Sequence, residues 1–272
     1  MKRVLGVIGY PISHSLSPVM HNAVIKRLKL NLELEYHAFE VKSEDLKEAV
    51  LGAKSLGFLG LNVTLPHKEK VLEFCDELSE EAKITGAVNT LLYKDNRIQG
   101  YNTDILGFEK SLEKYGLEGK SVAIIGAGGA SKSCVVACLR NQAKRIVIFD
   151  IIYEKAKALS EKFGCELGNI SEVNLPEYDI VINATPIGLK GENLFDSIGN
   201  PPPAEKKRIL FFDLIYIPTP FVKIAKKYGH YTDNGVDMFV LQGAESFKIW
   251  TGICPDTDYM KRVVVKNLSR RN

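Results

Sequence analysis

Two short segments near the start of the chain combine hydroxyl, amide and amine side chains where predicted strands end. Ser15 and Ser17 precede a predicted helix, whose free backbone N–H groups favour a bound carboxylate. Asn62, Thr64 and Lys68 lie along one edge of a later strand. Polar groups at such positions usually have a use in binding. This set can bind the carboxylate and hydroxyls of a small polar acid.

Three further polar residues extend the group: Asn89, Asp104 and Gln242, each in a predicted turn or near a helix start. Each residue also has an ordinary alternative. A lysine that follows a proline, as Lys68 does, is usually solvated. Asp104 could simply be the N-cap of a helix that begins at Ile105.

A glycine-rich segment, Gly126–Ser131, directly follows the apolar strand Ser121–Ile125 and opens a helix. In such a turn one glycine allows the tight bend, and the next lets the backbone approach a pyrophosphate at the helix N-terminus. The expected dinucleotide-binding residues are Gly126, Ala127, Gly128, Gly129 and Ala130. The alternative is a glycine-rich turn without a ligand, which the strand before and the acid after it disfavour.

That acid is Asp150, at the end of the next strand. A carboxylate there accepts hydrogen bonds from ribose hydroxyls and repels a 2′-phosphate, so it favours NAD over NADP. Neither Ile151 nor Ile152 can pair with a phosphate. Lys155 and Lys157 are better explained as the solvated face of the next helix.

The segment Asn183–Gly188 follows another buried strand. Ligands in open α/β sheets lie beyond the carboxyl ends of strands, so we expect this segment to contact the nicotinamide half of a dinucleotide. A plain Pro-Gly turn is the alternative.

Short apolar strands alternate with amphipathic helices, which predicts an α/β fold with mostly parallel sheets. Ser17 is expected to cap the first helix, with Pro18 as its first residue. The expected strands are 4–9, 32–40, 58–65, 88–93, 98–101, 121–125, 145–149, 178–183 and 208–213. The expected helices are 17–28, 43–55, 105–115, 129–141, 154–163, 219–228, 238–250 and 258–268. A tight turn is expected at 94–97, and a connector at Gly116–Lys120 separates the two halves.

The composition of the 272 residues excludes several classes of protein. A formal net charge of +3 is too small to indicate nucleic acid or an anionic membrane surface as a partner. The chain has neither a membrane-spanning apolar run nor a secretory signal, so we expect a cytoplasmic protein. Neither the five cysteines nor His14, His21 and His67 have the spacing of metal ligands, and no metal site is expected.

Taken in order, the motifs resemble the shikimate dehydrogenase family over most of the chain. They comprise Ser-x-Ser-Pro at 15–18, Asn-Val-Thr-x-Pro-x-Lys at 62–68, Gly-Ala-x-Asn-Thr at 86–90, Asn-Thr-Asp at 102–104, Asn-Ala-Thr-Pro-x-Gly at 183–188, and Gln-x-Ala-x-x-Phe-x-x-Trp-x-Gly at 242–252. Tyr216 with Thr219–Phe221 belongs to the same set.

The resemblance implies reversible reduction of 3-dehydroshikimate to shikimate in aromatic amino acid biosynthesis. Lys68 and Asp104 would form the catalytic pair. Substrate would be bound by Ser15, Ser17, Asn62, Thr64, Lys68, Asn89, Asp104, Tyr216 and Gln242. Besides the glycine turn and Asp150, the cofactor would contact Asn183, Thr185, Leu214 and Gly235.

The resemblance also implies the domain organisation. Residues 1–104 and 238–272 would form the substrate-binding catalytic domain, to which the C-terminal helices return, and 105–237 a Rossmann NAD(P)-binding domain. We expect the active site between them, domain closure during turnover, and a monomer or homodimer.

One departure leaves the cofactor open. The family usually has Asn-Arg-Thr where this chain has Asp150–Ile152, so NADP is the family norm and NAD is favoured here. The alternatives are an NAD-dependent quinate/shikimate dehydrogenase, a non-catalytic dinucleotide-sensing protein, and a folate-linked or glutamyl-tRNA-reducing relative. The intact Ser15 and Ser17 favour shikimate.

Overall fold

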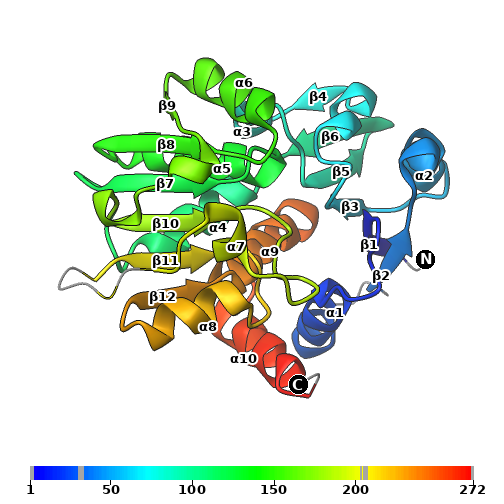
Figure 1. The fold of residues 1–272 in the computed structure, drawn as a ribbon. Helices are drawn as coiled ribbons and strands as arrows, with labels where there is room; N and C mark the ends of the chain where they lie inside the picture. Colours follow the sequence, from blue (N-terminus) through cyan, green and yellow to red (C-terminus); the bar gives the residue numbers. More distant parts are fainter. Residues whose placement is uncertain (1–2, 30–33, 203, 205–207, 271–272) are drawn as a thin grey trace. The chain divides into compact units, whose positions relative to one another are not determined.

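The computed structural model describes residues 3–29, 34–202, 204 and 208–270, and the chain divides into two compact units (Figure 1). The first unit comprises Met1–Asp104 and Val240–Asn272, and the second Ile105–Phe239. The first boundary is the one that the family resemblance implies, and it lies before the connector expected at Gly116–Lys120. The second lies two residues later, inside helix α9 (Val236–Thr251).

The first unit has a mixed six-stranded sheet in the order β2-β1-β3-β5-β6-β4. Its strands are β1 (Arg3–Gly9), β2 (Leu34–Glu40), β3 (Gly60–Val63), β4 (Glu77–Leu78), β5 (Thr90–Lys94) and β6 (Arg97–Tyr101). Strands β5 and β6 are antiparallel, joined by Asp95 and Asn96 with φ of 50° and 58°. Two successive left-handed residues make a type I′ hairpin turn, so the tight turn predicted here is confirmed. The predicted start of the second strand, residues 32–33, lies outside the described residues.

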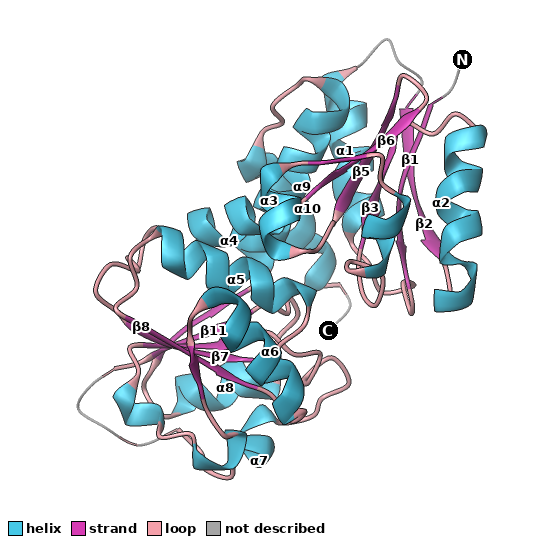
Figure 2. Cartoon of the chain, turned by 90° about the horizontal axis from the view of Figure 1, so that it is seen from above, coloured by secondary structure: helices cyan, strands magenta, loops and turns pink. Residues whose placement is uncertain are grey.

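Helices cover both faces of this sheet: α1 (Ser17–Leu28), α2 (Leu46–Ser55), α3 (Glu80–Thr85), α9 and α10 (Thr257–Leu268). Figure 2 shows α2 on one side of this sheet and α9 on the other. The core under α2 includes Leu46 and Val50, whereas Trp250 of α9 packs with Leu5 and Val7. The predicted cap of α1 is wrong. Ser17 is the first helical residue, Leu16 is the N-cap, and the Ser15 hydroxyl accepts the Ser17 N–H at 3.2 Å.

The second unit has a parallel six-stranded sheet in the order β12-β11-β10-β7-β8-β9. Its strands are β7 (Ser121–Ile125), β8 (Arg145–Phe149), β9 (Glu166–Leu167), β10 (Ile180–Asn183), β11 (Leu210–Asp213) and β12 (Tyr231–Asn234). The helices are α4 (Asp104–Leu112), α5 (Gly129–Arg140), α6 (Tyr153–Phe163), α7 (Leu194–Ile198) and α8 (Pro220–Lys227). This order is the doubly wound arrangement that binds dinucleotides at its centre, and the predicted α/β class is confirmed.

Successive residues of β7 point to opposite faces of this sheet, as the pleat requires. Val122 and Ile124 pack in the core with α4, α5 and α6, whereas Ala123 and Ile125 pack with α7 and α8. Because both faces are covered, the polar residues that follow the strands are concentrated at the sheet's carboxyl edge. That edge positions the glycine turn and the segment at 183–188.

Most of the predicted elements are present, and the predicted bounds of β7 and β8 agree with the structure. The short elements α3, α7, β4, β9 and β12 were not predicted, since two to six residues give too little periodicity to recognise. Helix α4 begins at Asp104 itself, so the alternative of Asp104 as the N-cap is wrong. Among the described residues, no helix combines the length and apolarity needed to cross a membrane.

Candidate active site

Lys68 and Asp104 form a close ion pair in the first unit. The Lys68 Nζ lies 2.6 Å from the Asp104 Oδ2, and the two side chains are 15% and 5% exposed. Lys68 follows β3 through Leu65, Pro66 and His67, and Asp104 follows β6 at the start of α4. Because water has little access to these two side chains, the surrounding protein determines the geometry of the pair.

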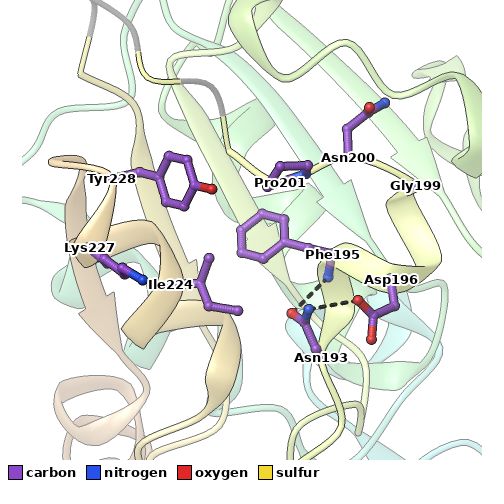
Figure 3. Close-up of a pocket in the computed structure, with 9 residues that line it drawn as sticks. All are labelled: Asn193, Phe195, Asp196, Gly199, Asn200, Pro201, Ile224, Lys227 and Tyr228. Atoms are coloured by element: carbon purple, nitrogen blue, oxygen red, sulfur yellow. Dashed lines mark hydrogen bonds between the residues drawn. The ribbon is translucent and has the colours of Figure 1, made fainter.

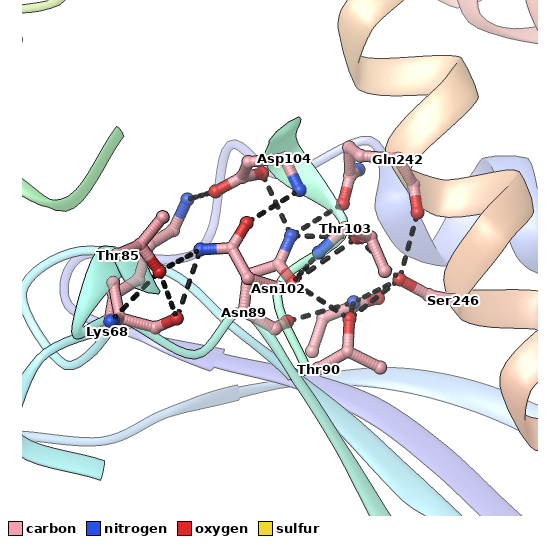
Figure 4. A network of polar contacts seen from close by, with 11 residues as sticks. Lys68, Thr85, Asn89, Thr90, Asn102, Thr103, Asp104, Gln242 and Ser246 are labelled. Atoms are coloured by element: carbon pink, nitrogen blue, oxygen red, sulfur yellow. Dashed lines mark hydrogen bonds and ion pairs between the residues drawn. The ribbon is translucent and has the colours of Figure 1, made fainter. Parts of the chain in front are cut away.

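Asn89 joins this pair to the rest of the site (Figure 4). Its Nδ2 donates to the second oxygen of Asp104 at 2.8 Å and to the Gln242 Oε1 at 3.4 Å. Its own Oδ1 accepts the backbone N–H of Thr103 at 2.8 Å. Asp104 is therefore held from both carboxylate oxygens, with Asn89 on one and Lys68 on the other. The structure thus brings together four of the predicted site residues.

Asn62 is oriented by Asn89, a predicted site residue, and by Tyr36, Thr90 and Ser246, to which the sequence assigned no role. Its Nδ2 donates to the backbone carbonyl of Asn89, to Thr90 Oγ1 and to Ser246 Oγ, all within 3.1 Å, while its Oδ1 accepts the Tyr36 hydroxyl at 2.7 Å. Tyr36 and Ser246 are fully buried. No motif points to Ser246. Tyr36 could have been noticed as the one residue in its strand with a hydroxyl on a buried face.

The chain of contacts extends from Asn62 to the two predicted carboxylate-binding serines. Burial raises the pKa of Tyr36 well above its usual range, opposed by a hydrogen bond with Ser17. Tyr36 thus keeps its proton and links Ser17 to Asn62. Ser15 hydrogen-bonds the Ser17 N–H, and Thr64 accepts the His67 N–H through its backbone carbonyl. The Thr64 side chain is half-buried near Gly9.

The glycine turn of the second unit combines one position that only glycine can occupy with one that is open to solvent. Gly126 has φ of +112°, and a Cβ there would lie 2.8 Å from the Ala184 carbonyl oxygen, so only glycine fits. Gly128 is different: it is exposed, and a Cβ there would meet nothing within 4 Å. Open space beside a helix N-terminus leaves room for a phosphate. The Ser131 hydroxyl in the first turn of α5 is buried without a protein partner.

Asp150 closes this turn from the end of β8. Its Oδ2 accepts the Ala127 N–H at 2.7 Å, and its Oδ1 accepts the Ile152 N–H at 2.8 Å. Each carboxylate oxygen retains a lone pair for a further donor. Ile151, Ile152 and Tyr153 beside it are exposed apolar side chains, 68%, 48% and 51% accessible.

The other predicted cofactor residues lie at the carboxyl ends of neighbouring strands. Asn183 is the last residue of β10, and its Oδ1 accepts both the N–H and the hydroxyl of Thr185, at 3.0 and 2.7 Å. Leu214 follows β11. A Cβ on Gly235 would lie 2.1 Å from the Leu214 carbonyl oxygen, so these two backbones touch. Tyr216, predicted to bind substrate, belongs to this second unit and packs on Phe239 with ring centroids 4.6 Å apart.

A separate pocket of about 570 Å³ in the second unit contains none of these residues (Figure 3). It lies between α7 and α8, with Phe195, Ile224 and Tyr228 among its lining residues. Within the described ranges, no group of three His, Cys, Asp or Glu side chains could hold a metal ion. The first unit therefore contains one set of candidate residues, the polar network around Lys68 and Asp104, and the second unit contains another, at the carboxyl edge of its sheet.

Comparison with known families covers most of the chain. Residues 7–91 match the shikimate dehydrogenase substrate-binding domain, 109–215 match shikimate / quinate 5-dehydrogenase, and 235–265 match the shikimate 5′-dehydrogenase C-terminal domain. A relative from Methanococcus maripaludis, called shikimate dehydrogenase (NADP(+)), is 41% identical over 98% of both chains.

Solved structures give the same result. A shikimate dehydrogenase in complex with NADP+ is 37% identical, with a TM-score of 0.87 over 98% of this chain and 96% of its own. The shikimate 5-dehydrogenase of Listeria monocytogenes, in complex with shikimate and NAD, is 33% identical, with a TM-score of 0.83 over 97% and 96% of the two chains.

Proposed function

The chain belongs to the shikimate dehydrogenase family, and from that premise we propose which of its residues carry out the reduction of 3-dehydroshikimate to shikimate. The observation that supports the assignment most directly is the partly buried Lys68–Asp104 pair, 2.6 Å apart, with Asn89 on the second carboxylate oxygen.

Lys68 is the acid and base of this proposal. A nicotinamide dinucleotide bound by the second unit would supply the hydride that reduces the carbonyl carbon of the substrate. The Lys68 ammonium donates a proton to the oxygen, and in the reverse direction its amine takes that proton back. Asp104 orients the amine through the 2.6 Å ion pair, while Asn89 keeps the carboxylate in place.

Substrate recognition falls to the remaining polar residues. Ser15 and Ser17 hold the carboxylate at the start of α1. Asn62, Thr64, Asn89 and Gln242 hold the ring hydroxyls together with the catalytic pair, and a role in substrate binding is proposed for Tyr216 as well. A network already satisfied before substrate arrives presents preorganised donors and acceptors, which lowers the entropy that binding must overcome.

The main alternative, a quinate/shikimate dehydrogenase, differs in substrate preference. The experiment is a spectrophotometric assay at about 340 nm with shikimate and quinate, each with NAD and NADP, comparing kcat/KM. We expect shikimate to be preferred. A preference for quinate would replace the proposal with that alternative. Binding of cofactor and shikimate without turnover would instead favour the non-catalytic dinucleotide sensor.

The cofactor itself is bound by the second unit, with the glycine turn at its pyrophosphate and Asn183, Thr185, Leu214 and Gly235 toward its nicotinamide half. The relatives are called NADP(+) enzymes, which lends no support to a preference for NAD. We nevertheless propose that this chain favours NAD. Asp150 has a lone pair on each oxygen for the ribose hydroxyls, and Ile151 offers no charge to a 2′-phosphate.

A double substitution tests this preference. Asp150→Asn with Ile151→Arg removes the repulsion and supplies a phosphate-binding guanidinium, so the kcat/KM ratio of NADP to NAD should rise about tenfold or more. Ile151→Arg alone is the matched control, because it leaves the hydrogen bonds of Asp150 to Ala127 and Ile152 intact. An unchanged ratio in both variants would show that the carboxylate does not face the ribose.

We also propose a cytoplasmic location and a monomeric or homodimeric state. All five cysteines are free thiols, as expected in a reducing compartment. Light scattering coupled to gel filtration measures the mass, and a tetramer or larger assembly would contradict the second proposal.

A further inference from the structure

Three neighbouring strands of the second sheet end in polar residues at the same level. In the parallel register, Asn183 of β10 pairs with Asp213 of β11, which pairs with Asn234 of β12. Asp213 is the central member and is fully buried. Carboxylates are rarely fully buried unless they are paired with a cation, so a buried carboxylate between two amides at the carboxyl edge of a sheet is unusual.

Asp213 accepts hydrogen bonds from three directions. The Asn183 Nδ2 donates to its Oδ1 at 3.0 Å, and the Ile215 N–H donates to the same oxygen at 2.9 Å. The Thr219 hydroxyl donates to its Oδ2 at 2.6 Å. All three donors are uncharged, and so are its register neighbours Asn183 and Asn234. The carboxylate therefore holds its surroundings together through hydrogen bonds, with no cation among these partners.

These contacts join two segments that follow different strands. Asn183 begins the segment 183–188, and its Oδ1 holds Thr185. Ile215 and Thr219 belong to the segment 214–219, which follows β11. The segments also touch directly, since a Cβ on Gly188 would lie 2.9 Å from the Thr219 Cγ2. Asp213 is the shared acceptor on which both segments converge.

We propose that Asp213 is a positioning residue for the nicotinamide half of the cofactor, acting by fixing segments 183–188 and 214–219 to each other. This inference rests on the proposed function, which puts Asn183, Thr185 and Leu214 against the cofactor. It goes further by naming the group that sets their position. Asp213 need not touch the cofactor itself.

The three contacts predict which substitution preserves the arrangement. An asparagine can accept from Asn183 and Ile215 with its oxygen and donate to the Thr219 oxygen with its nitrogen. Burial raises the pKa of Asp213 to about 6, and the same pattern of bonds would serve its protonated form. An alanine offers no acceptor and leaves three donors unsatisfied.

The test compares Asp213→Ala with Asp213→Asn. Asp179→Asn is the matched control, because Asp179 accepts the Ser121 N–H at 2.9 Å and precedes β10 at the opposite edge of the same sheet. Fluorescence titration measures NADPH and NADH affinity. Calorimetry measures the affinity for shikimate. It also measures the affinity for ADP and 2′,5′-ADP, two cofactor fragments that lack the nicotinamide half. Circular dichroism sets a temperature at which each variant is folded.

We expect Asp213→Ala to weaken the binding of NADPH and NADH by about tenfold or more, and Asp213→Asn to weaken it by less than about threefold. Shikimate, and the two fragments that lack the nicotinamide half, should bind to every variant with the affinity that they have for wild type. Equal loss of fragments and dinucleotides in Asp213→Ala would mean general damage to the second unit and would overturn the inference. So would unchanged dinucleotide binding. Failure of the wild-type protein to bind either dinucleotide would overturn the proposed function as well.

Discussion

Among the described residues, each unit has one buried carboxylate near the end of a strand, and the surroundings of the two differ. Asp104 of the first unit, 4% exposed, faces the ammonium of Lys68. Asp213 of the second unit, 0% exposed, is surrounded by uncharged donors. The first carboxylate is paired with a group that can move a proton, whereas the second only accepts. Burial alone therefore does not identify a catalytic acid; the nature of its partner does.

The energetics of the two sites differ accordingly. A buried charge beside an opposite charge regains by Coulomb attraction part of what it loses in hydration. A buried charge whose partners are all uncharged recovers less of its lost hydration free energy, so the protonated carboxyl group is favoured. This is why burial raises the pKa of Asp213 to about 6. The first unit thus places its carboxylate beside an amine that can transfer a proton. The second has a carboxylate that ordinary changes in pH can neutralise.

The largest expected effect comes from removing the cation of the first pair. Lys68→Ala should lower kcat by about 10²- to 10⁴-fold while changing the dissociation constant of shikimate far less, because proton transfer is lost. Steady-state kinetics and calorimetry separate the two quantities. Lys68→Arg is the sharper variant, since it keeps a cation beside Asp104 but holds its proton too tightly to transfer it. A change confined to KM in either variant would contradict the catalytic role.

The second effect tests the uncompensated carboxylate. The folded-state pKa of Asp213 lies above its ordinary value of 3.8, so the folded protein binds more protons between these values and loses stability as pH rises. Between about pH 4.5 and pH 7, Asp213→Asn should gain about 2 kcal/mol in unfolding free energy relative to wild type. Urea unfolding at both pH values measures this. If the difference in unfolding free energy between Asp213→Asn and wild type did not change with pH, burial would not raise the pKa of Asp213 in the folded protein.

The smallest effect comes from the first unit and has the opposite sign. His21 is fully buried with neither ring nitrogen bonded, stacks on Tyr36 at 4.3 Å, and has its pKa lowered from 6.5 to about 3 by burial. The unfolded chain then binds the extra proton, so stability is lost as pH falls below about 6.5.

His21→Phe should remove that loss, about 1 kcal/mol between pH 7 and pH 5.5. Unfolding measurements on this variant and on His37→Phe, an exposed position, provide the comparison. Equal acid sensitivity in wild type and His21→Phe would show that the histidine is hydrated in solution.

Much of the fold could be predicted because its signals are local. The apolar runs of β7 and β8 on either side of Gly126–Ser131 identified a dinucleotide-binding unit, and the structure has both strands as predicted. Helix starts were less certain: Ser17 has the residue type of a cap, yet Leu16 occupies that position and the Ser15 hydroxyl binds the Ser17 N–H. Several residues compete for one capping site, and only the backbone angles decide among them.

By itself, the sequence determined the order of the longer strands and helices, the glycine turn, and the residue types available for proton transfer, since these follow from neighbours along the chain. Only the tertiary structure decided which polar groups meet. Asn62 binds Ser246, 184 positions away, and Asp213 gathers Asn183 and Thr219 from separate segments. A hydrogen bond requires direction and contact within about 3 Å, and no local period in a sequence encodes the meeting of two distant side chains.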